Sequence, residues 1–167
     1  MEAAGDAIYC ALGKAVVLFQ WLENQLRLVA GFAISPKTAG FAVPEAHPRK
    51  FHQLVSLTAR EVHAFANRYG GDIAAEFLQQ FPDIFDRCQG LGRRRNELLH
   101  STYVHIESSG ELLAMVRSNA RVDKTGNLVR SQEDLSPSSF DSFLHDVAVT
   151  GFELGIIHRQ LIAWYRP

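Results

Sequence analysis

The first third of the chain carries an apolar repeat of helical period, and this repeat limits the possible folds more than any other feature. At about 100° per residue, one stripe is formed by Ile8, Leu12, Ala15, Phe19, Leu22, Leu26, Val29 and Ala33. Other faces carry Val17, Leu18, Trp21 and Leu28. A helix that is apolar on two sides is usually buried on two sides. The pattern therefore fits either a central core helix or a helix that also meets a second subunit.

Helical periodicity continues through residue 100. Residues 35–48 contain three prolines and a glycine, which predicts a loop. Residues 51–69 form a one-sided amphipathic repeat that ends at Gly70 and Gly71. A further helical run covers about residues 72–100, with a break or kink expected at Pro82.

Beyond Ser101 the period changes to that of strands. "TYVHIE" (102–107) and "ELLAMVRS" (111–118) are β-like runs, and "DKTGN" (123–127) predicts a second turn. Ser136 followed by Pro137 resembles the start of a last helix, in which Gly151 and Gly155 would allow a close helix contact. The predicted fold is a mainly α antiparallel bundle, one domain over 1–167, with a β-hairpin or meander at about 102–130.

The composition and charge of the chain argue against several classes of function. A formal net charge of −1 over 167 residues argues against a globally basic nucleic-acid binder, so any site for a polyanion must be local. Cys10 and Cys88 form no CxxC pair and the histidines show no HxxxH spacing, so we expect no disulfide, metal or cofactor and a reducing cytoplasmic location. The first apolar stretch is interrupted by the charged residues Lys14, Glu23 and Arg27. These charges argue against a signal peptide or a membrane span.

The most informative segment is "RRRNELLHS", residues 93–101. Arg95 falls in the middle of an apolar stripe that also includes Ile84, Cys88, Leu91, Leu98, Leu99 and Thr102. A guanidinium among apolar side chains keeps its charge, so it must meet a carboxylate, carbonyl or phosphate, or line a cleft. Arg93 and Arg94 point elsewhere and fit the charge that favours a helix C-terminus, with a secondary role in attracting phosphate.

Asn96 and His100 are four residues apart and share one helix face, where the amide can orient the imidazole. Arg95 is rotated by about 140° from His100 on an ideal helix. Either the last turn is distorted near Ser101, or two copies of the helix face each other and complete one site. On residue chemistry alone, His100 also fits a simple helix-end cation.

The pattern Arg95-Asn96-x-x-x-His100, late in a helical chain and followed by a β-like excursion and a long last helix, resembles the signature of HEPN domains. The resemblance implies a metal-independent endoribonuclease of toxin or phage-defence type, active as a homodimer. The motifs of both subunits would meet in its cleft, and a cognate antitoxin protein would be a further partner. In such a site His100 is the general acid or base, Arg95 holds the phosphate, and Asn96 orients His100 or binds the phosphate.

Two other interpretations remain open. The chain fits a noncatalytic HEPN-like module that binds a nucleotide, RNA or a protein partner, and it also fits a helical dimerisation protein with no ligand site. Under the latter, Arg95 would form an internal ion pair with Glu23, which lies at the edge of the first stripe, about 60° from Ile8. Glu23 is not counted as catalytic.

Overall fold

The computed structural model describes residues 2–38, 50–108, 111–123 and 125–165. The chain divides into two compact units. One, here called the sheet unit, comprises residues up to 17 and residues 93–145, and the other, the helical unit, comprises residues 18–92 and 146–167. Helices α1 (Glu2–Ile34), α4 (Ile84–His100) and α5 (Asp141–Trp164) contribute residues to both units.

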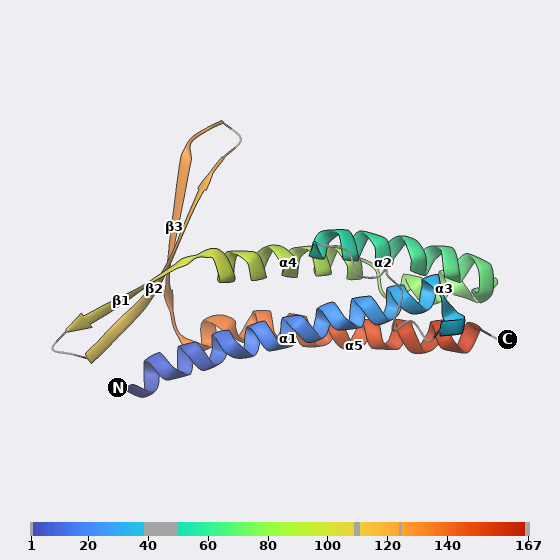
Figure 1. Ribbon diagram of the computed structural model, residues 1–167, viewed down its shortest axis with the longest axis horizontal. Helices are drawn as coiled ribbons and strands as arrows, with labels where there is room; N and C mark the ends of the chain where they lie inside the picture. The colour runs from blue at the N-terminus through green and yellow to red at the C-terminus, as the bar shows by residue number, and fades with distance from the viewer. Residues whose placement is uncertain (1, 39–49, 109–110, 124, 166–167) are drawn as a thin grey trace. The chain divides into compact units, whose positions relative to one another are not determined.

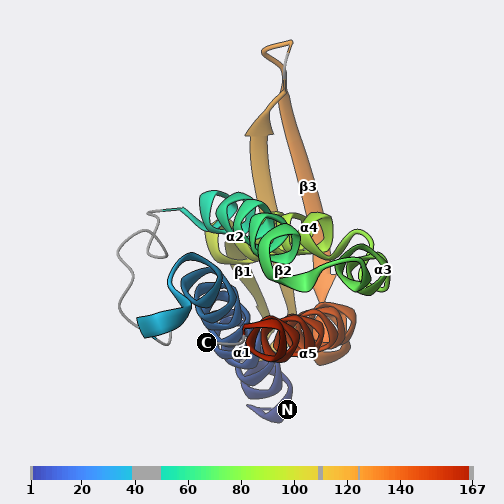
Figure 2. The same ribbon diagram turned by 90° about the vertical axis from the view of Figure 1, so that its right-hand side faces the viewer.

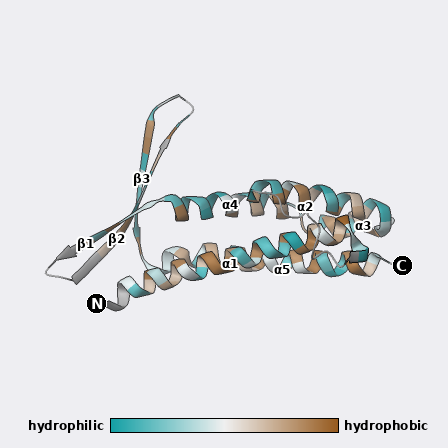
Figure 3. Cartoon of the chain, in the orientation of Figure 1, coloured by the Kyte–Doolittle hydropathy of each residue, from teal (hydrophilic) through white to brown (hydrophobic). Residues whose placement is uncertain are grey.

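The helical unit is a bundle built from the parts of α1, α4 and α5 that belong to it and from two shorter helices, α2 (Phe51–Phe65) and α3 (Ile73–Gln79). Within this unit, Figures 1 and 2 show α1 beside α5 and α2 beside α4, with α4 running opposite to the other three. The apolar stripes predicted from the sequence meet in its core, and brown, hydrophobic residues recur along α1, α2 and α5 in Figure 3. Its fully buried members include Leu22, Leu26 and Val29 of α1, Leu54 and Val62 of α2, and Leu154 and Leu161 of α5.

The predicted helix ends are confirmed with two local differences. The second helix continues to Gly70 as predicted, but its last five residues, Ala66–Gly70, widen into a π-helix before Gly71 adopts a left-handed φ of 57°. The break expected at Pro82 separates α3 from α4, and Asp83 beside it has a φ of 54°. Of the loop predicted over 35–48, Pro36–Thr38 form a short 3-10 turn, and residues 39–48 lie outside the described residues.

The sheet unit contains a three-stranded antiparallel sheet in the order β1-β2-β3. Strand β1 (Thr102–Ser108) pairs with the first part of β2 (Glu111–Val122), and β3 (Leu128–Leu135) pairs with its second part. Only Met115–Ser118 therefore have partners on both sides, and the two hairpins diverge from this short region (Figure 1). The sheet is a meander, and it extends five residues beyond the predicted limit of 130.

The sheet unit has a small apolar core where the sheet meets its helical segments. Met115 of β2 pairs with Leu135 of β3, and both are buried. The other buried apolar members are Ile8, Ala11 and Ala15 of α1, Leu98 of α4, Phe140 of the 3-10 turn Pro137–Phe140, and Phe143 of α5. The predicted start of the last helix at Ser136 and Pro137 is confirmed, because the Ser136 N–H donates to Ser139 Oγ at 3.0 Å just before α5.

The long first helix is apolar on more than one face, as predicted, but its second face is not uniformly buried. Trp21 packs against Phe152 of α5 with ring centroids 5.6 Å apart, whereas Val17 is 71% exposed. Among the described residues, no helix combines the length and apolar composition that a membrane span requires. The architecture is thus mainly α with a small antiparallel sheet before the last helix.

Substitutions at Gly151 and Gly155 test how closely α1 packs on α5 in the helical unit. A Cβ at Gly151 would overlap the Trp21 ring, whereas a Cβ at Gly155 would make only ordinary contacts, 3.8 Å from Arg159 Nη1 and 3.9 Å from Gln25 Oε1. We expect Gly151→Ala to lower the free energy of unfolding by about 1–3 kcal/mol because of overpacking. Gly155→Ala should raise it by up to about 1 kcal/mol, because alanine favours helices. Urea unfolding of both variants measures the difference, and equal effects would contradict this packing.

Candidate functional site at the end of α4

The end of α4 is fixed by two hydrogen bonds from residues that follow the helix. Ser101 Oγ donates to the Glu97 carbonyl, and the Tyr103 hydroxyl donates to the Leu98 carbonyl. These carbonyls belong to the last helical turn, and no following turn of the helix supplies backbone N–H groups to hydrogen-bond with them. The same turn carries His100, so both bonds hold the backbone next to the candidate histidine.

The three predicted site residues all lie on this last part of α4. Arg95 is half-buried, while Asn96 and His100 are exposed. Arg95 Nη1 donates to Asn96 Oδ1 at 2.9 Å. Asn96 shares its helix face with His100, so this hydrogen bond connects the Arg95 guanidinium to a residue of that face.

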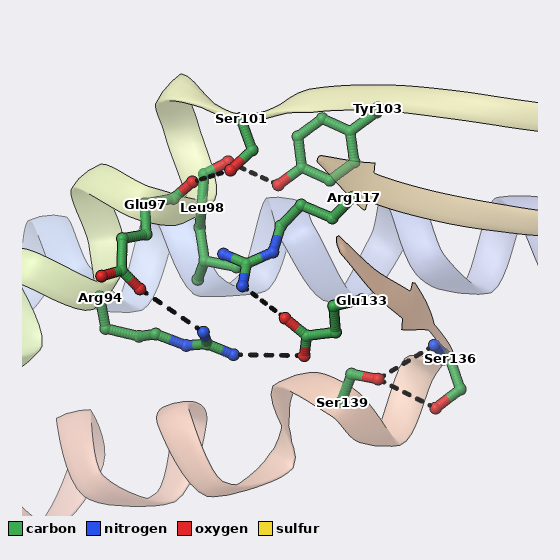
Figure 4. A network of polar contacts seen from close by, with 9 residues as sticks. All are labelled: Arg94, Glu97, Leu98, Ser101, Tyr103, Arg117, Glu133, Ser136 and Ser139. Atoms are coloured by element: carbon green, nitrogen blue, oxygen red, sulfur yellow. Dashed lines mark hydrogen bonds and ion pairs between the residues drawn. The ribbon is translucent and has the colours of Figure 1, made fainter. Parts of the chain in front are cut away.

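A charged network beside this turn joins α4 to the sheet (Figure 4). Glu133 of β3 uses its two carboxylate oxygens for two different arginines: Oε2 pairs with Arg117 Nη2 of β2, and Oε1 lies 3.4 Å from Arg94 Nη2. Arg94 Nη1 also lies 3.6 Å from Glu97 Oε2, one turn along the helix. Two arginines and two glutamates thus alternate in a chain with no net charge.

Arg117 is the most enclosed member of the network. The residue is only 7% exposed, in the strand run "ELLAMVRS" that sequence reasoning treated as simply β-like. Its Nη1 is buried and has no hydrogen-bond partner among the described residues. A buried guanidinium cannot lose its charge, so it needs a counter-charge nearby. The Glu133 carboxylate supplies that charge but leaves one nitrogen of Arg117 without a hydrogen bond.

Tyr103 borders the same network. Burial raises the pKa of its phenol, and Arg117 and Arg94 oppose that rise by favouring the phenolate. The net direction is upward, so the neutral hydroxyl persists as the donor that the Leu98 carbonyl requires.

One expectation about "RRRNELLHS" is incomplete and another is wrong. Arg94 lies near the helix end as expected, but its side chain is also about two-thirds buried between Glu97 and Glu133. The apolar stripe around Arg95 also ends earlier than predicted: Leu98 is buried, but Leu99 is 40% exposed and Thr102 already belongs to β1. The helix stops near the end of this stripe, so its last positions face solvent.

The other candidates from the sequence are placed as follows. The Glu23 carboxylate pairs with Arg27 one turn along α1, and its pairing with Arg95 stays a prediction. His158 is half-buried with its ring 5.6 Å from that of Phe32, and burial lowers its pKa. Within the described ranges, no cluster of three or more His, Cys, Asp or Glu side chains could hold a metal ion.

Sequence reasoning missed Arg117, Glu133 and Tyr103. The signal for Arg117 was its place in an apolar strand run, two residues from Met115 and therefore on the same face of the strand. Glu133 and Tyr103 gave no such signal. They come next to the helix end only through strand pairing and the turn at Ser101.

Comparisons of the chain with protein-family models, with curated proteins and with solved structures give no match. The function proposed below therefore rests on the residues of this chain and on the motif they resemble.

Tyr103 provides a test of the helix end. Since its pKa is raised in the folded state, its stabilising contribution is fully present below the ordinary tyrosine value and is lost as pH rises through the raised value. Tyr103→Phe should lower the free energy of unfolding by about 1 kcal/mol at neutral pH, because the bond to Leu98 is lost. In the same variant, the free energy of unfolding should fall less steeply above about pH 10, because the phenol that titrates there is gone.

Urea unfolding at neutral and alkaline pH measures both effects, with exposed Tyr69→Phe as the matched control. If the two variants behave alike at both pH values, the Tyr103 hydroxyl does not stabilise the end of α4.

Proposed function

We propose that the chain is a HEPN-like, metal-independent endoribonuclease of toxin or phage-defence type that acts in the cytoplasm as a homodimer. The observation that carries the proposal is the grouping at the end of α4: exposed His100, exposed Asn96, and Arg95 hydrogen-bonded to Asn96. A histidine suits proton transfer, and a guanidinium and an amide suit binding of the phosphate, so each helix end supplies half of the groups for cleavage by the neighbouring ribose hydroxyl.

The reaction uses two histidines and therefore two copies of the chain. His100 of one copy accepts the proton of the ribose 2′-OH as that oxygen attacks the adjacent phosphorus. The bond from phosphorus to the 5′-oxygen breaks, and His100 of the other copy donates a proton to the leaving oxygen. The products are a 2′,3′-cyclic phosphate and a 5′-hydroxyl. Arg95 holds the phosphate and stabilises the charge that grows on its oxygens.

The local hydrogen bonds support this division of roles. Asn96 Oδ1 accepts from Arg95, which leaves the amide nitrogen as a donor toward the His100 face or a phosphate oxygen. The dimer is formed by the first and motif-bearing helices in this proposal. A protein antitoxin that covers the end of α4 would control such an activity by excluding RNA.

A noncatalytic HEPN-like module is the second candidate. It is favoured by the ion pairs of Arg94, which reduce the positive charge available to a long RNA next to the motif. Such a module binds a nucleotide, RNA or a protein partner without cleaving, and a ligand would raise its thermal stability.

Cleavage assays separate the two candidates. The protein incubated with RNA in EDTA should release fragments with 2′,3′-cyclic phosphate ends, and His100→Ala should lower the rate by about 10²–10⁴-fold. The matched control is His145→Ala, which removes an exposed histidine of α5. Cleavage by His100→Ala at the control rate would contradict the assignment of His100, and absence of cleavage by the unmodified dimer would favour the noncatalytic module.

A further inference from the structure

Glu133 occupies the space between two arginines without satisfying either of them fully. Its two oxygens are divided, one for Arg117 and one for Arg94. Neither arginine receives the two parallel hydrogen bonds that a guanidinium forms best with an oxyanion. The 3.4 Å separation from Arg94 Nη2 is at the long end of hydrogen bonding.

The unpaired nitrogen of Arg117 shows which contact is missing. Arg117 Nη1 is buried and finds no partner in the described part of the chain, although the Nη2 of the same guanidinium is paired. A carboxylate that spans two arginines has no third oxygen to offer. A phosphate group has more acceptor oxygens, so it can accept from both Arg117 nitrogens and still reach Arg94.

We propose that Arg94 and Arg117 form a phosphate-binding subsite beside the motif, and that the Glu133 carboxylate occupies it until a phosphate group displaces it. The chemistry recognised is a phosphate oxyanion, from an RNA backbone or from a free phosphate. Where that phosphate belongs to RNA, the inference rests on the proposed function and deepens it by adding a second phosphate contact to that of Arg95.

Displacement needs the movement of one side chain at an accessible position. The side chains of Glu133 and Arg94 are 34% and 36% exposed, and the residues of β3 before Glu133 are exposed. Strand β3 lies at the edge of the sheet. Glu133 can therefore turn toward solvent while Arg117 and the buried pair Met115 and Leu135 stay in place.

The network becomes positively charged when Glu133 turns away, and positive charge favours binding of a phosphate. With Glu133 in place the network is neutral, and with Glu133 turned away Glu97, paired with Arg94, is its one remaining carboxylate among the described residues. That carboxylate is 44% exposed and lies 3.6 Å from Arg94 Nη1, which leaves Arg94 Nη2 free to meet an incoming oxyanion. The geometry describes a self-covered anion site that opens when its internal carboxylate leaves.

Two pairs of variants test the subsite, each pair matched in charge and position. Glu133→Gln removes the internal anion, and Asp134→Asn makes the same change at the next, exposed residue of β3. Arg94→Gln removes one half-buried guanidinium, and Arg93→Gln removes its exposed neighbour. The probes are inorganic phosphate and an RNA oligonucleotide with 2′-O-methyl riboses, which presents phosphates but cannot be cleaved through the 2′-oxygen.

Titration calorimetry of the full chain measures the affinity. Glu133→Gln should bind the probe about tenfold more tightly than Asp134→Asn, and Arg94→Gln about tenfold more weakly than Arg93→Gln. Tighter binding of both probes indicates a site for free phosphate, whereas tighter binding of the oligonucleotide alone indicates a backbone subsite. Equal affinities within the Arg94 and Arg93 pair overturn the proposal, whatever the Glu133 variant does.

The test is independent of catalysis. If the binding test finds no subsite but the protein still cleaves RNA in EDTA, the nuclease proposal stands. Tight binding by Glu133→Gln in a protein that cleaves nothing would leave the subsite standing and remove the nuclease.

Discussion

The buried charge of Arg117 is the constraint around which the sheet unit is organised. A guanidinium inside a strand must have an anion close by, and Glu133 on the neighbouring strand supplies it through the register of β2 and β3. The same carboxylate reaches Arg94, so one residue ties two strands to the motif-bearing helix (Figure 4). Shifting β3 by one residue would move Glu133 to the other face of the sheet and leave Arg117 without a counter-charge.

This arrangement places the candidate site on a rigid support. The last turn of α4 is held on its backbone by Ser101 and Tyr103 and on its side by Arg94. Asn96 and His100 stay exposed on that turn. In the proposed reaction, groups that transfer protons work best when neighbouring contacts fix their position, and Ser101, Tyr103 and Glu133 provide such contacts here.

The sequence predicted the elements whose signal is local and missed those that depend on distant contacts. Stripes such as Leu22, Leu26 and Val29 reveal a buried helix face directly, and Pro82 and Ser136 mark helix boundaries by their own chemistry. Arg94 and Glu133 are 39 residues apart, so no periodicity connects them. For the same reason the sequence predicts helix-end charge at Arg94 and not its pairing with Glu133. Arg95, Asn96 and His100 could be predicted as a candidate site because their spacing on one helix is local, whereas the proposed pairing with a second copy depends on association, for which the sequence carries no local signal.

In the proposed function, one catalytic site needs the motif of two chains. Unmodified protein and His100→Ala can be unfolded together in urea, refolded at varied ratios and assayed for RNA cleavage in EDTA. If each site uses His100 from both copies, an equal mixture should retain about one quarter of the activity, because only pairs of unmodified chains are active. Retention of about one half, in proportion to the unmodified chain, would show that each copy acts alone and would contradict the account.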